Sequence, residues 1–381
     1  TDTPKGKYLP WIKAAILPLM IVTVLGFWAH PEWSSTTKTI YVFVMYFAWA
    51  FAFTCGNILY TALTAVMTQD PTERASLAGW RMAFSNAVMA VQGILVIPLV
   101  GKLGGNNPAQ GWVKVVIIFA IIGCVCMYIA AFNCKEVVRK PQSIEENAKI
   151  MESIKLAMKN KPYMIVCLGM FILGVANLGR MTSMTYYFTY TVQNIGLMGG
   201  FTTAQAIGGI IGALFGVPFL VKTMQHKGKV VALCSAIAVV GMIIQFVAQQ
   251  NATVFLVGAF VQQFGTYSAL TTIMSMMADC VELSLLNEGV RMDGFFSAFG
   301  YFWHKLGIAL GSAATGWILG IMHYVPNAAE QAASVYTGIN IMFFYIPTVL
   351  FVIMALAFLA YPISNKKFEE IVAQIAEKYG N

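Results

Sequence analysis

The stretch GYFWHKLGIALG, residues 300–311, places a single lysine inside a run of aromatic, aliphatic and glycine residues. The apolar segment around it, residues 294–321, is long enough to cross about 30 Å of hydrocarbon, for which about 20 helical residues suffice. A lysine at the centre of such a helix costs roughly 2.5–3.5 kcal/mol on insertion scales. The segment is therefore interpreted as a membrane span in which Lys305 requires a partner or a water-filled pathway.

The whole chain has the composition of a membrane protein. Hydrophobic residues make up 58% of its 381 residues and charged residues 10%, against roughly 25% charged in ordinary soluble domains. Length and apolar character predict ten spans and an all-α polytopic membrane protein. The predicted spans are residues 10–28, 40–63, 76–100, 112–132, 163–190, 198–221, 229–248, 253–278, 294–321 and 335–361.

The basic residues alternate between the loops. The net charge of +8 could suggest a nucleic-acid partner, but lysine and arginine gather before the first span, in residues 133–162, between spans six and seven, and in the tail. The other loops carry almost none, which is the positive-inside pattern. It predicts a multi-pass protein of the inner membrane with both ends of this chain in the cytoplasm, the bilayer as a partner and no nucleic acid. We expect a monomer.

The seven cysteines show no metal-ligand spacing, and we interpret them as small apolar filler in a reduced protein. The sequence therefore predicts no metal centre. The four histidines, His30, His226, His304 and His323, are dispersed. His304 beside Lys305 could relay protons, but neighbouring helical residues point apart. A membrane enzyme usually clusters such groups, so we predict that the chain is not an enzyme.

Residues 133–162 form the one long polar stretch and divide the chain into four spans before it and six after it. Six spans after a central basic loop are typical of one half of a major-facilitator-type transporter, which has two six-helix bundles. We predict an incomplete N-terminal bundle at 1–132, a linker at 133–162, a C-terminal bundle at 163–361 and a tail at 362–381. Ten transmembrane helices are then present of an expected twelve.

Both the linker and the tail are predicted to contain an amphipathic helix. Ser143 and Glu146 form an S-x-x-E capping box, and apolar residues then recur at helical spacing. The stripes are Ile144, Ala148, Met151, Ile154 and Met158 in the linker, and Phe368, Ile371, Val372 and Ile375 in the tail. A role in gating and a role as a membrane-surface anchor both remain open.

Small residues recur at packing intervals in spans six and nine. They are Gly208, Gly212 and Gly216 in the first and Gly307 and Gly311 in the second. Such glycines let helix backbones approach closely, and we favour this packing role over a hinge.

Three basic residues lie within spans, Arg81, Arg180 and Lys305, whereas no acidic residue sits deep in any span. Buried cations normally face a partner or a water-filled cavity. Either the partner carboxylates lie on helices outside this chain, or the ligand brings negative charge or many hydroxyls. A snorkelling Lys305 is the alternative.

A polar and aromatic set in span two suits a sugar. Asn57 and Thr61 are one helical turn apart, and Phe53 and Tyr60 add rings on that side. Amide, guanidinium and ammonium groups hydrogen-bond hydroxyls, and aromatic faces stack on a pyranose. A helix–helix hydrogen bond from Asn57 is the competing interpretation.

Charged residues of both signs follow spans two and eight. They are Asp70 and Arg74 after the first, and Asp279, Glu282 and Arg291 after the second. Ion pairs between the two sets could close a cytoplasmic gate and break as the bundles rock. Ordinary loop capping is the alternative.

At these positions the sequence resembles the glycoside–pentoside–hexuronide cation symporter family of the major facilitator superfamily. Leu9 and Leu59 stand where the family usually has arginine and proline. The matching segments are Gly6–Trp11, Asn57–Tyr60 with Leu63, Asp70–Leu77 with Arg81 and Phe84, Ala278–Glu282 with Val290, Arg291, Ser297 and Lys305, and Tyr324–Asn327.

The resemblance implies that the ten spans correspond to family helices three to twelve, so the chain is expected to be short by about two N-terminal helices. Those helices carry the acidic cation ligands, which Lys305 would then meet. It also implies that Asn57, Thr61, Arg81 and Lys305 line the sugar site, with Phe53, Tyr60 and Tyr301 flanking it. Thr54 and Lys305 fall at the cation site.

The sequence thus predicts a secondary transporter that couples entry of Na⁺ or H⁺ to uptake of a glycoside, pentoside or hexuronide by alternating access, with no other cofactor. The surplus of site cations favours an acidic substrate such as a hexuronide. A truncated, non-transporting remnant or a membrane-bound sugar-binding protein is the alternative.

Overall fold

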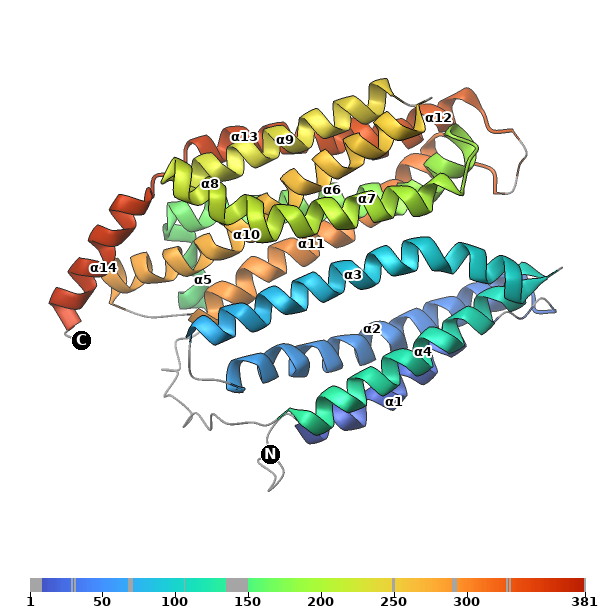
Figure 1. Ribbon diagram of the computed structural model, residues 1–381, viewed down its shortest axis with the longest axis horizontal. Helices are drawn as coiled ribbons and strands as arrows, with labels where there is room; N and C mark the ends of the chain where they lie inside the picture. The colour runs from blue at the N-terminus through green and yellow to red at the C-terminus, as the bar shows by residue number, and fades with distance from the viewer. Residues whose placement is uncertain are drawn as a thin grey trace. The chain divides into compact units, whose positions relative to one another are not determined.

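The computed structural model is built from long helices and, within the part of the chain that it describes, contains no strand (Figure 1). The described residues are 9–28, 30, 32–67, 71–105, 107–134, 150–248, 251–289, 293–326, 328 and 330–379. Each of the ten predicted spans coincides with a helix, which confirms the all-α class. The helices are α1 (Leu9–Gly26), α2 (Ser35–Val66), α3 (Pro71–Gly104), α4 (Pro108–Asn133), α5 (Ile150–Lys159), α6 (Lys161–Tyr186), η1 (Tyr187–Thr191), α7 (Leu197–Ile211), η2 (Gly212–Gly216), α8 (Val217–Met224), α9 (Lys227–Val247), α10 (Ala252–Glu288), α11 (Asp293–Ile321), α12 (Ala333–Asn340), η3 (Ile341–Tyr345), α13 (Ile346–Leu359) and α14 (Asn365–Tyr379).

Nine helical stretches among the described residues have the length and hydropathy of a membrane span. Three of them continue through a π-helical turn, namely η1 after α6, η2 between α7 and α8, and η3 between α12 and α13. The helix α11 is not one of the nine, although it has 29 residues. His304 and Lys305, near its middle, lower its mean hydropathy.

Polar side chains cap several helix beginnings. Asn107, Asn160 and Asn251 each accept a hydrogen bond from backbone N–H groups in the first turn of α4, α6 and α10. These oxygens satisfy donors that have no partner inside the helix. At its other end α10 stops at Gly289, whose φ of 72° lies in the left-handed region that glycine adopts without strain.

The chain forms two compact units. Unit 1 comprises Thr1–Ser85 and Ile94–Glu145, and unit 2 comprises Asn86–Gly93 and Glu146–Asn381. Each unit has its own hydrophobic core. The bundle, linker and tail boundaries drawn from the sequence remain predictions.

The core of unit 1 lies along α1. Leu9, Ile12 and Ile16 of this helix are buried against Leu63 of α2 and Ala131 of α4. The three inward positions of α1 recur at intervals of three and four residues, the spacing of one helix face.

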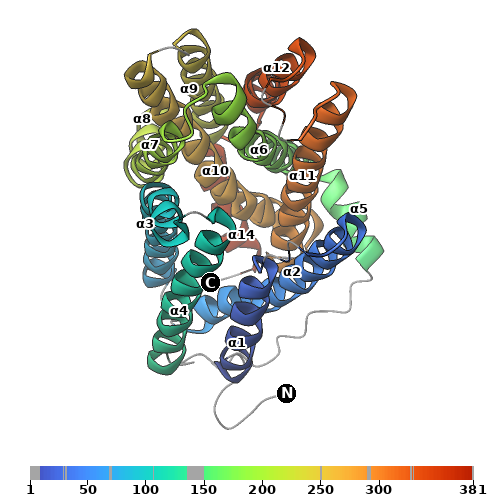
Figure 2. The ribbon, with the colours of Figure 1, turned by 90° about the vertical axis from the view of Figure 1, so that its right-hand side faces the viewer.

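In unit 2, α6 and α11 pack with their backbones in contact, and they lie side by side in Figure 2. A Cβ atom on Gly307 would collide with the carbonyl oxygen of Phe171, and one on Gly311 would lie 2.5 Å from that of Val175. The predicted packing role of these glycines is confirmed.

Glycine residues also allow close packing of α7 and η2 against α10. A Cβ atom on Gly208 would collide with the carbonyl oxygen of Phe260, and one on Gly212 would lie 2.6 Å from that of Phe264. A Cβ atom on Gly216 would lie 2.8 Å from the Phe264 ring. All five glycines singled out in the sequence therefore stand where another helix approaches closely.

The short helix α5 presents a different face to the core from the predicted one. Ser153 and Ala157 are buried, whereas Ile154 is half-buried and Met158 is 59% exposed. The predicted stripe placed Ile154 and Met158 on the buried face of α5. Ser153 and Ala157 are buried instead, because small side chains let this helix approach the bundle closely. The capping box at 143–146 lies outside the described residues.

The tail helix α14 follows its predicted stripe more closely. Ile371 is buried, Phe368 and Ile375 pack against the core of unit 2, and Val372 is 44% exposed. This helix therefore docks on unit 2 through one narrow edge of the predicted apolar face.

Candidate functional site

The residues of α2 predicted to meet a sugar share one accessible side of unit 1. Phe53, Asn57 and Tyr60 are all exposed, at helical intervals of four and three residues. Trp49 lies one turn before Phe53, and their rings stack with centroids 5.1 Å apart and an interplanar angle of 11°. The ring of Tyr46 continues this ladder, 6.1 Å from that of Trp49.

Trp49 and Tyr46 were missed by the sequence reasoning. Their spacing of four and seven residues before Phe53 is the signal that could have found them, because such residues lie on the same helix face. Stacked aromatic rings beside an amide are suited to the apolar and polar sides of a sugar ring.

The remaining candidates of unit 1 are positioned by α2 and α3. The Thr54 side chain is exposed on α2. Thr61 is helical, but its side chain lies outside the described residues. Arg81 is half-buried on α3 and makes an interaction with another group of the protein.

In unit 2, Tyr301 and Lys305 lie one turn apart on α11, and both are exposed. The opposite side of this helix carries Gly307 and Gly311, which face α6. Close packing of the glycine side therefore fixes the direction in which the lysine side points. The adjacent His304 points elsewhere, since its Nδ1 lies 3.0 Å from the carbonyl oxygen of Met170 on α6.

The two acidic gate candidates after predicted span eight, Asp279 and Glu282, belong to α10 rather than to a loop, because this helix runs ten residues beyond the predicted span end at 278. Asp279 is 5% exposed, and both of its carboxylate oxygens accept hydrogen bonds from Lys227 at the start of α9. Glu282 is half-buried and also has an interaction partner. From the sequence, Lys227 is one of the basic residues between spans six and seven, with no predicted partner.

The other gate candidates cannot be placed as side chains. Asp70 and Arg291 lie outside the described residues. Arg74 lies within the first turns of α3, so it too belongs to a helix and not to a loop, and its side chain is outside the described part.

Arg180 lies in the interior of unit 2, where it is 4% exposed. Its Nη2 donates a hydrogen bond to Oε1 of Gln245 on α9. Its guanidinium carbon lies 4.3 Å from the ring centroid of Phe343 and 5.8 Å from that of Phe344, both in the π-helical turn η3. No carboxylate pairs with Arg180 among the described residues. Its described contacts are therefore aromatic faces and one amide, and its buried Nε and Nη1 have no hydrogen-bond partner among the described residues.

A second buried polar contact joins α7 to α10. Gln205 donates from Nε2 to Oε1 of Gln262 at 3.1 Å, and Gln262 donates to the hydroxyl of Thr266 at 3.0 Å. These amides satisfy one another away from water, as buried polar groups must. They account for polar residues that lie inside the predicted spans and belong to no predicted site.

Long apolar helices in two units, with accessible polar and aromatic side chains along α2 and α11, define a multi-pass membrane transporter. The chain belongs to the MFS/sugar transport protein family, whose model matches residues 1–365. Membership confirms the predicted major-facilitator architecture and the prediction that the chain is not an enzyme.

Individual relatives cover almost the whole chain. The putative glycoside/cation symporter YagG of Escherichia coli K12 is 28% identical over 98% of this chain and 81% of its own length. The glucuronide carrier protein homolog of the same strain is 26% identical over the same shares. The isoprimeverose transporter of Lactiplantibacillus pentosus is 29% identical over 100% of this chain and 78% of its own.

Proposed function

We propose that this protein is a secondary active transporter that couples Na⁺ or H⁺ to the symport of a glycoside, pentoside or hexuronide by alternating access. The observation that carries the proposal is the accessible Lys305 in the middle of α11, in a chain of the sugar-transport family. An ammonium group at that depth persists where it meets a solute pathway or a coupling-ion site. Relatives named as symporters and transporters favour this function over a non-transporting remnant or a membrane-bound sugar-binding protein.

The proposed substrate site has a hydrogen-bonding set and an aromatic set. Asn57, Thr61, Arg81 and Lys305 would donate to or accept from sugar hydroxyls, as their amide, hydroxyl, guanidinium and ammonium groups allow. Phe53, Tyr60 and Tyr301 would cover apolar faces of the ring. We add Trp49 to the aromatic set, because it stacks on Phe53. The hydroxyl of Thr54 and the ammonium of Lys305 are proposed to act at the cation site.

An acidic sugar is the substrate class that we favour. Two cationic side chains, Arg81 and Lys305, belong to the proposed site, and a guanidinium binds a carboxylate through two parallel hydrogen bonds. The relatives include a homolog of a glucuronide carrier, but also an isoprimeverose transporter. The preference for an acidic sugar therefore rests on the two cationic side chains of the proposed site, because the relatives' names include both an acidic and a neutral sugar.

We further propose that Asp70, Arg74, Asp279, Glu282 and Arg291 contribute to a gate on the cytoplasmic side, where both ends of this chain would lie. For Asp279 the contribution would be indirect. Its carboxylate is held by Lys227 within unit 2, so it would fix the position of the α9 and α10 ends.

The test is uptake by the full-length protein reconstituted in liposomes. Labelled glucuronide, a neutral glycoside and a pentoside are offered with an inward Na⁺ gradient, with a proton gradient and with neither. We expect accumulation of the glucuronide above equilibrium with one of the two gradients only. Accumulation of the neutral glycoside alone would reject the acidic class, and equilibration without accumulation under every gradient would reject symport.

A further inference from the structure

Buried polar atoms without a partner gather at one packing contact of unit 2. Within the part of the chain that the structure describes, seven buried side-chain nitrogen and oxygen atoms lack a hydrogen-bond partner. Five of them belong to the helices of one contact, that of α6 and η1 with α12 and η3. They are Nε and Nη1 of Arg180, the hydroxyl oxygens of Tyr187 and Thr191, and Oδ1 of Asn340. Because buried polar groups in proteins are nearly always paired, this contact suits a bound polar group.

Both helices of this contact also leave regular α-helical geometry in the same region. The π-helical turn η1 begins at Tyr187, and η3 begins at Ile341, directly after Asn340. The ring of Phe343 in η3 stacks on that of Tyr187, with centroids 4.3 Å apart and an interplanar angle of 5°. Single π-helical turns inside α-helices are rare and frequently lie at functional sites. The irregular turns and the unpaired atoms are independent features that mark the same place.

Arg180 is the charged member of this group. Its Nε and Nη1 carry three N–H donors, and neither nitrogen has a partner among the described residues. Its Nη2 donates to Gln245, whose side chain is itself buried. The rings of Phe201, Phe343 and Phe344 have centroids within 5.8 Å of its guanidinium carbon. These partners are neutral and an arginine keeps its charge in proteins, so no described residue compensates this positive charge with a negative one.

A small anion fits these surroundings better than water does. Water would accept from the N–H donors but would leave the charge, and an unpaired buried charge is far more costly than a buried polar group. An anion accepts from the same donors and also cancels the charge. Phe201 and Phe343 are at most 1% exposed, so the surroundings of Arg180 are enclosed. A singly charged, monatomic ion matches one guanidinium, whereas a doubly charged sulfate would bring surplus charge.

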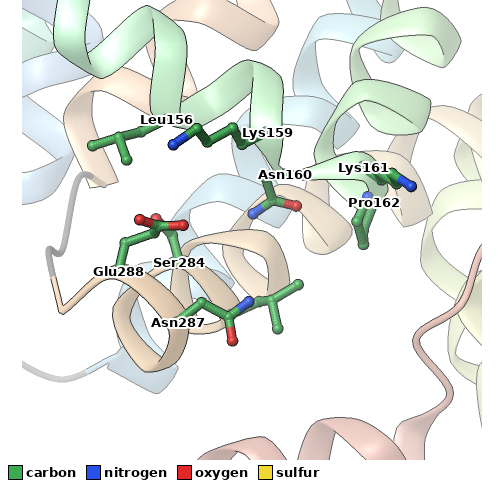
Figure 3. Close-up of a pocket in the computed structure, with 9 residues that line it drawn as sticks. Leu156, Lys159, Asn160, Lys161, Pro162, Ser284, Asn287 and Glu288 are labelled. Atoms are coloured by element: carbon green, nitrogen blue, oxygen red, sulfur yellow. The ribbon is translucent and has the colours of Figure 1, made fainter.

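The open cavity of unit 2 is a separate feature. It has a volume of about 240 Å³ and lies where the turn between α5 and α6 meets the end of α10 (Figure 3). Lys159 and Glu288 on its walls are exposed, so water solvates their charges. Arg180 does not line this cavity and, at 4% exposure, is withdrawn from bulk water.

We propose that unit 2 binds one chloride ion in its interior, held by the N–H groups of Arg180 that have no described partner. The ion neutralises the guanidinium and so stabilises the packing of α6 against α9 and η3. Its class is a monovalent halide, and none of the residues proposed for the sugar or the coupling cation takes part. The inference therefore stands apart from the proposed transport function.

Thermal unfolding of the purified full chain in detergent tests this inference. Chloride is exchanged for gluconate, a much larger anion, at constant sodium concentration and ionic strength. A ligand that binds only the folded state stabilises it by linkage, so each tenfold increase in chloride above its dissociation constant should raise the unfolding temperature by roughly 2–4 °C. An unfolding temperature that does not depend on chloride, as expected if water alone meets these donors, would overturn the proposal.

Two variants assign the effect to Arg180. Gln245→Glu places a carboxylate beside the guanidinium at almost unchanged volume, so the chain itself supplies the negative charge and the chloride response should be lost. Arg180→Met removes the positive charge and should lose the response as well. The control Lys222→Met, which removes an exposed lysine of α8, should respond as the wild type does. A wild-type response in Gln245→Glu or in Arg180→Met would overturn the proposal.

Bromide locates the ion in the unaltered chain, so this measurement does not require any variant to fold. Bromide has the charge of chloride and a similar size, and it scatters X-rays anomalously. Crystals grown with bromide in place of chloride are expected to show an anomalous peak in contact with the guanidinium of Arg180. Clear density for Arg180 and Phe343 without such a peak would overturn the proposal. Neither measurement involves sugar uptake, so a failure of the proposed transport function would leave both results unchanged.

Discussion

The ammonium nitrogen of Lys227 lies 2.8 and 2.7 Å from the two carboxylate oxygens of Asp279, across 52 positions of sequence. The same nitrogen lies 5.5 Å from the ring centroid of Phe368 on α14. This cluster ties the start of α9 and the end of α10 to the tail helix within unit 2. Asp279 is therefore neutralised inside its own unit.

Replacing Lys227 by methionine is expected to destabilise the protein by about 3 kcal/mol, because it leaves a nearly buried carboxylate without its cation. Thermal unfolding in detergent measures the change. Lys222→Met removes an exposed cation from the neighbouring helix α8 and should leave the unfolding temperature unchanged. Equal unfolding temperatures for both variants would mean that the pair adds no stability.

Gly307→Ala is expected to destabilise unit 2 by about 1–3 kcal/mol, since the added methyl group overpacks the contact between α6 and α11. The matched control is Gly316→Ala on the same helix, where a Cβ atom meets nothing within 4 Å. The control should unfold at the wild-type temperature or slightly above it, because alanine favours a helix more than glycine does. A control that falls as far as Gly307→Ala would refute the packing argument.

Arg180→Lys is expected to destabilise the protein by about 2 kcal/mol despite its unchanged charge. The guanidinium carbon lies 4.3 Å from the centroid of the Phe343 ring, and a guanidinium is planar and weakly hydrated, whereas an ammonium is compact and strongly hydrated. Arg180→Met keeps much of the volume without the charge and should unfold at a higher temperature than Arg180→Lys. The opposite order would show that the charge alone stabilises this position.

Lys305→Ala and Arg81→Ala are each expected to abolish sugar accumulation while leaving membrane insertion and folding intact. Both cations are proposed to contact the solute, and loss of a charge-assisted hydrogen bond costs about 1.5–3 kcal/mol of binding. Initial uptake rates in liposomes, corrected for the amount of inserted protein, give the result. Phe302→Ala, which truncates an exposed α11 residue outside the proposed site, is the control. Uptake at the wild-type rate by either cation variant would remove that residue from the site.

The spans and the close helix crossings could be predicted from the sequence because their causes are local. A run of about 20 apolar residues predicts a membrane-spanning helix. Gly307 and Gly311 are four residues apart, which places them on the same helix face. The direction of Lys305 follows from the same spacing, since the side opposite the glycines must point away from α6.

The partners of charged residues could not be predicted in this way. Lys227 and Asp279 meet only because α9 packs along α10, and nothing in the sequence between these two residues, which are 52 positions apart, specifies that contact. Arg180 was expected to require a carboxylate or a cavity, but among the described residues it contacts the amide of Gln245 and the ring of Phe343. Amides and aromatic rings carry no charge signal in a sequence, so a search for acidic partners overlooks them.

The π-helical turns interrupt the 3.6-residue periodicity of the spans in which they lie, so one helical wheel cannot describe such a span from end to end. A π-helical turn bonds residue i to residue i+5 and so inserts one extra residue into the helix. Beyond η2 and η3, where the helix continues as α8 and α13, the side chains are consequently rotated by about 100° from the phase of the residues before them. One-residue deletions at these turns would restore an unbroken phase and swing Phe344, among others, out of its present orientation. These helices thus present two differently oriented faces along one continuous axis, which a regular heptad or 3.6-residue repeat could not encode.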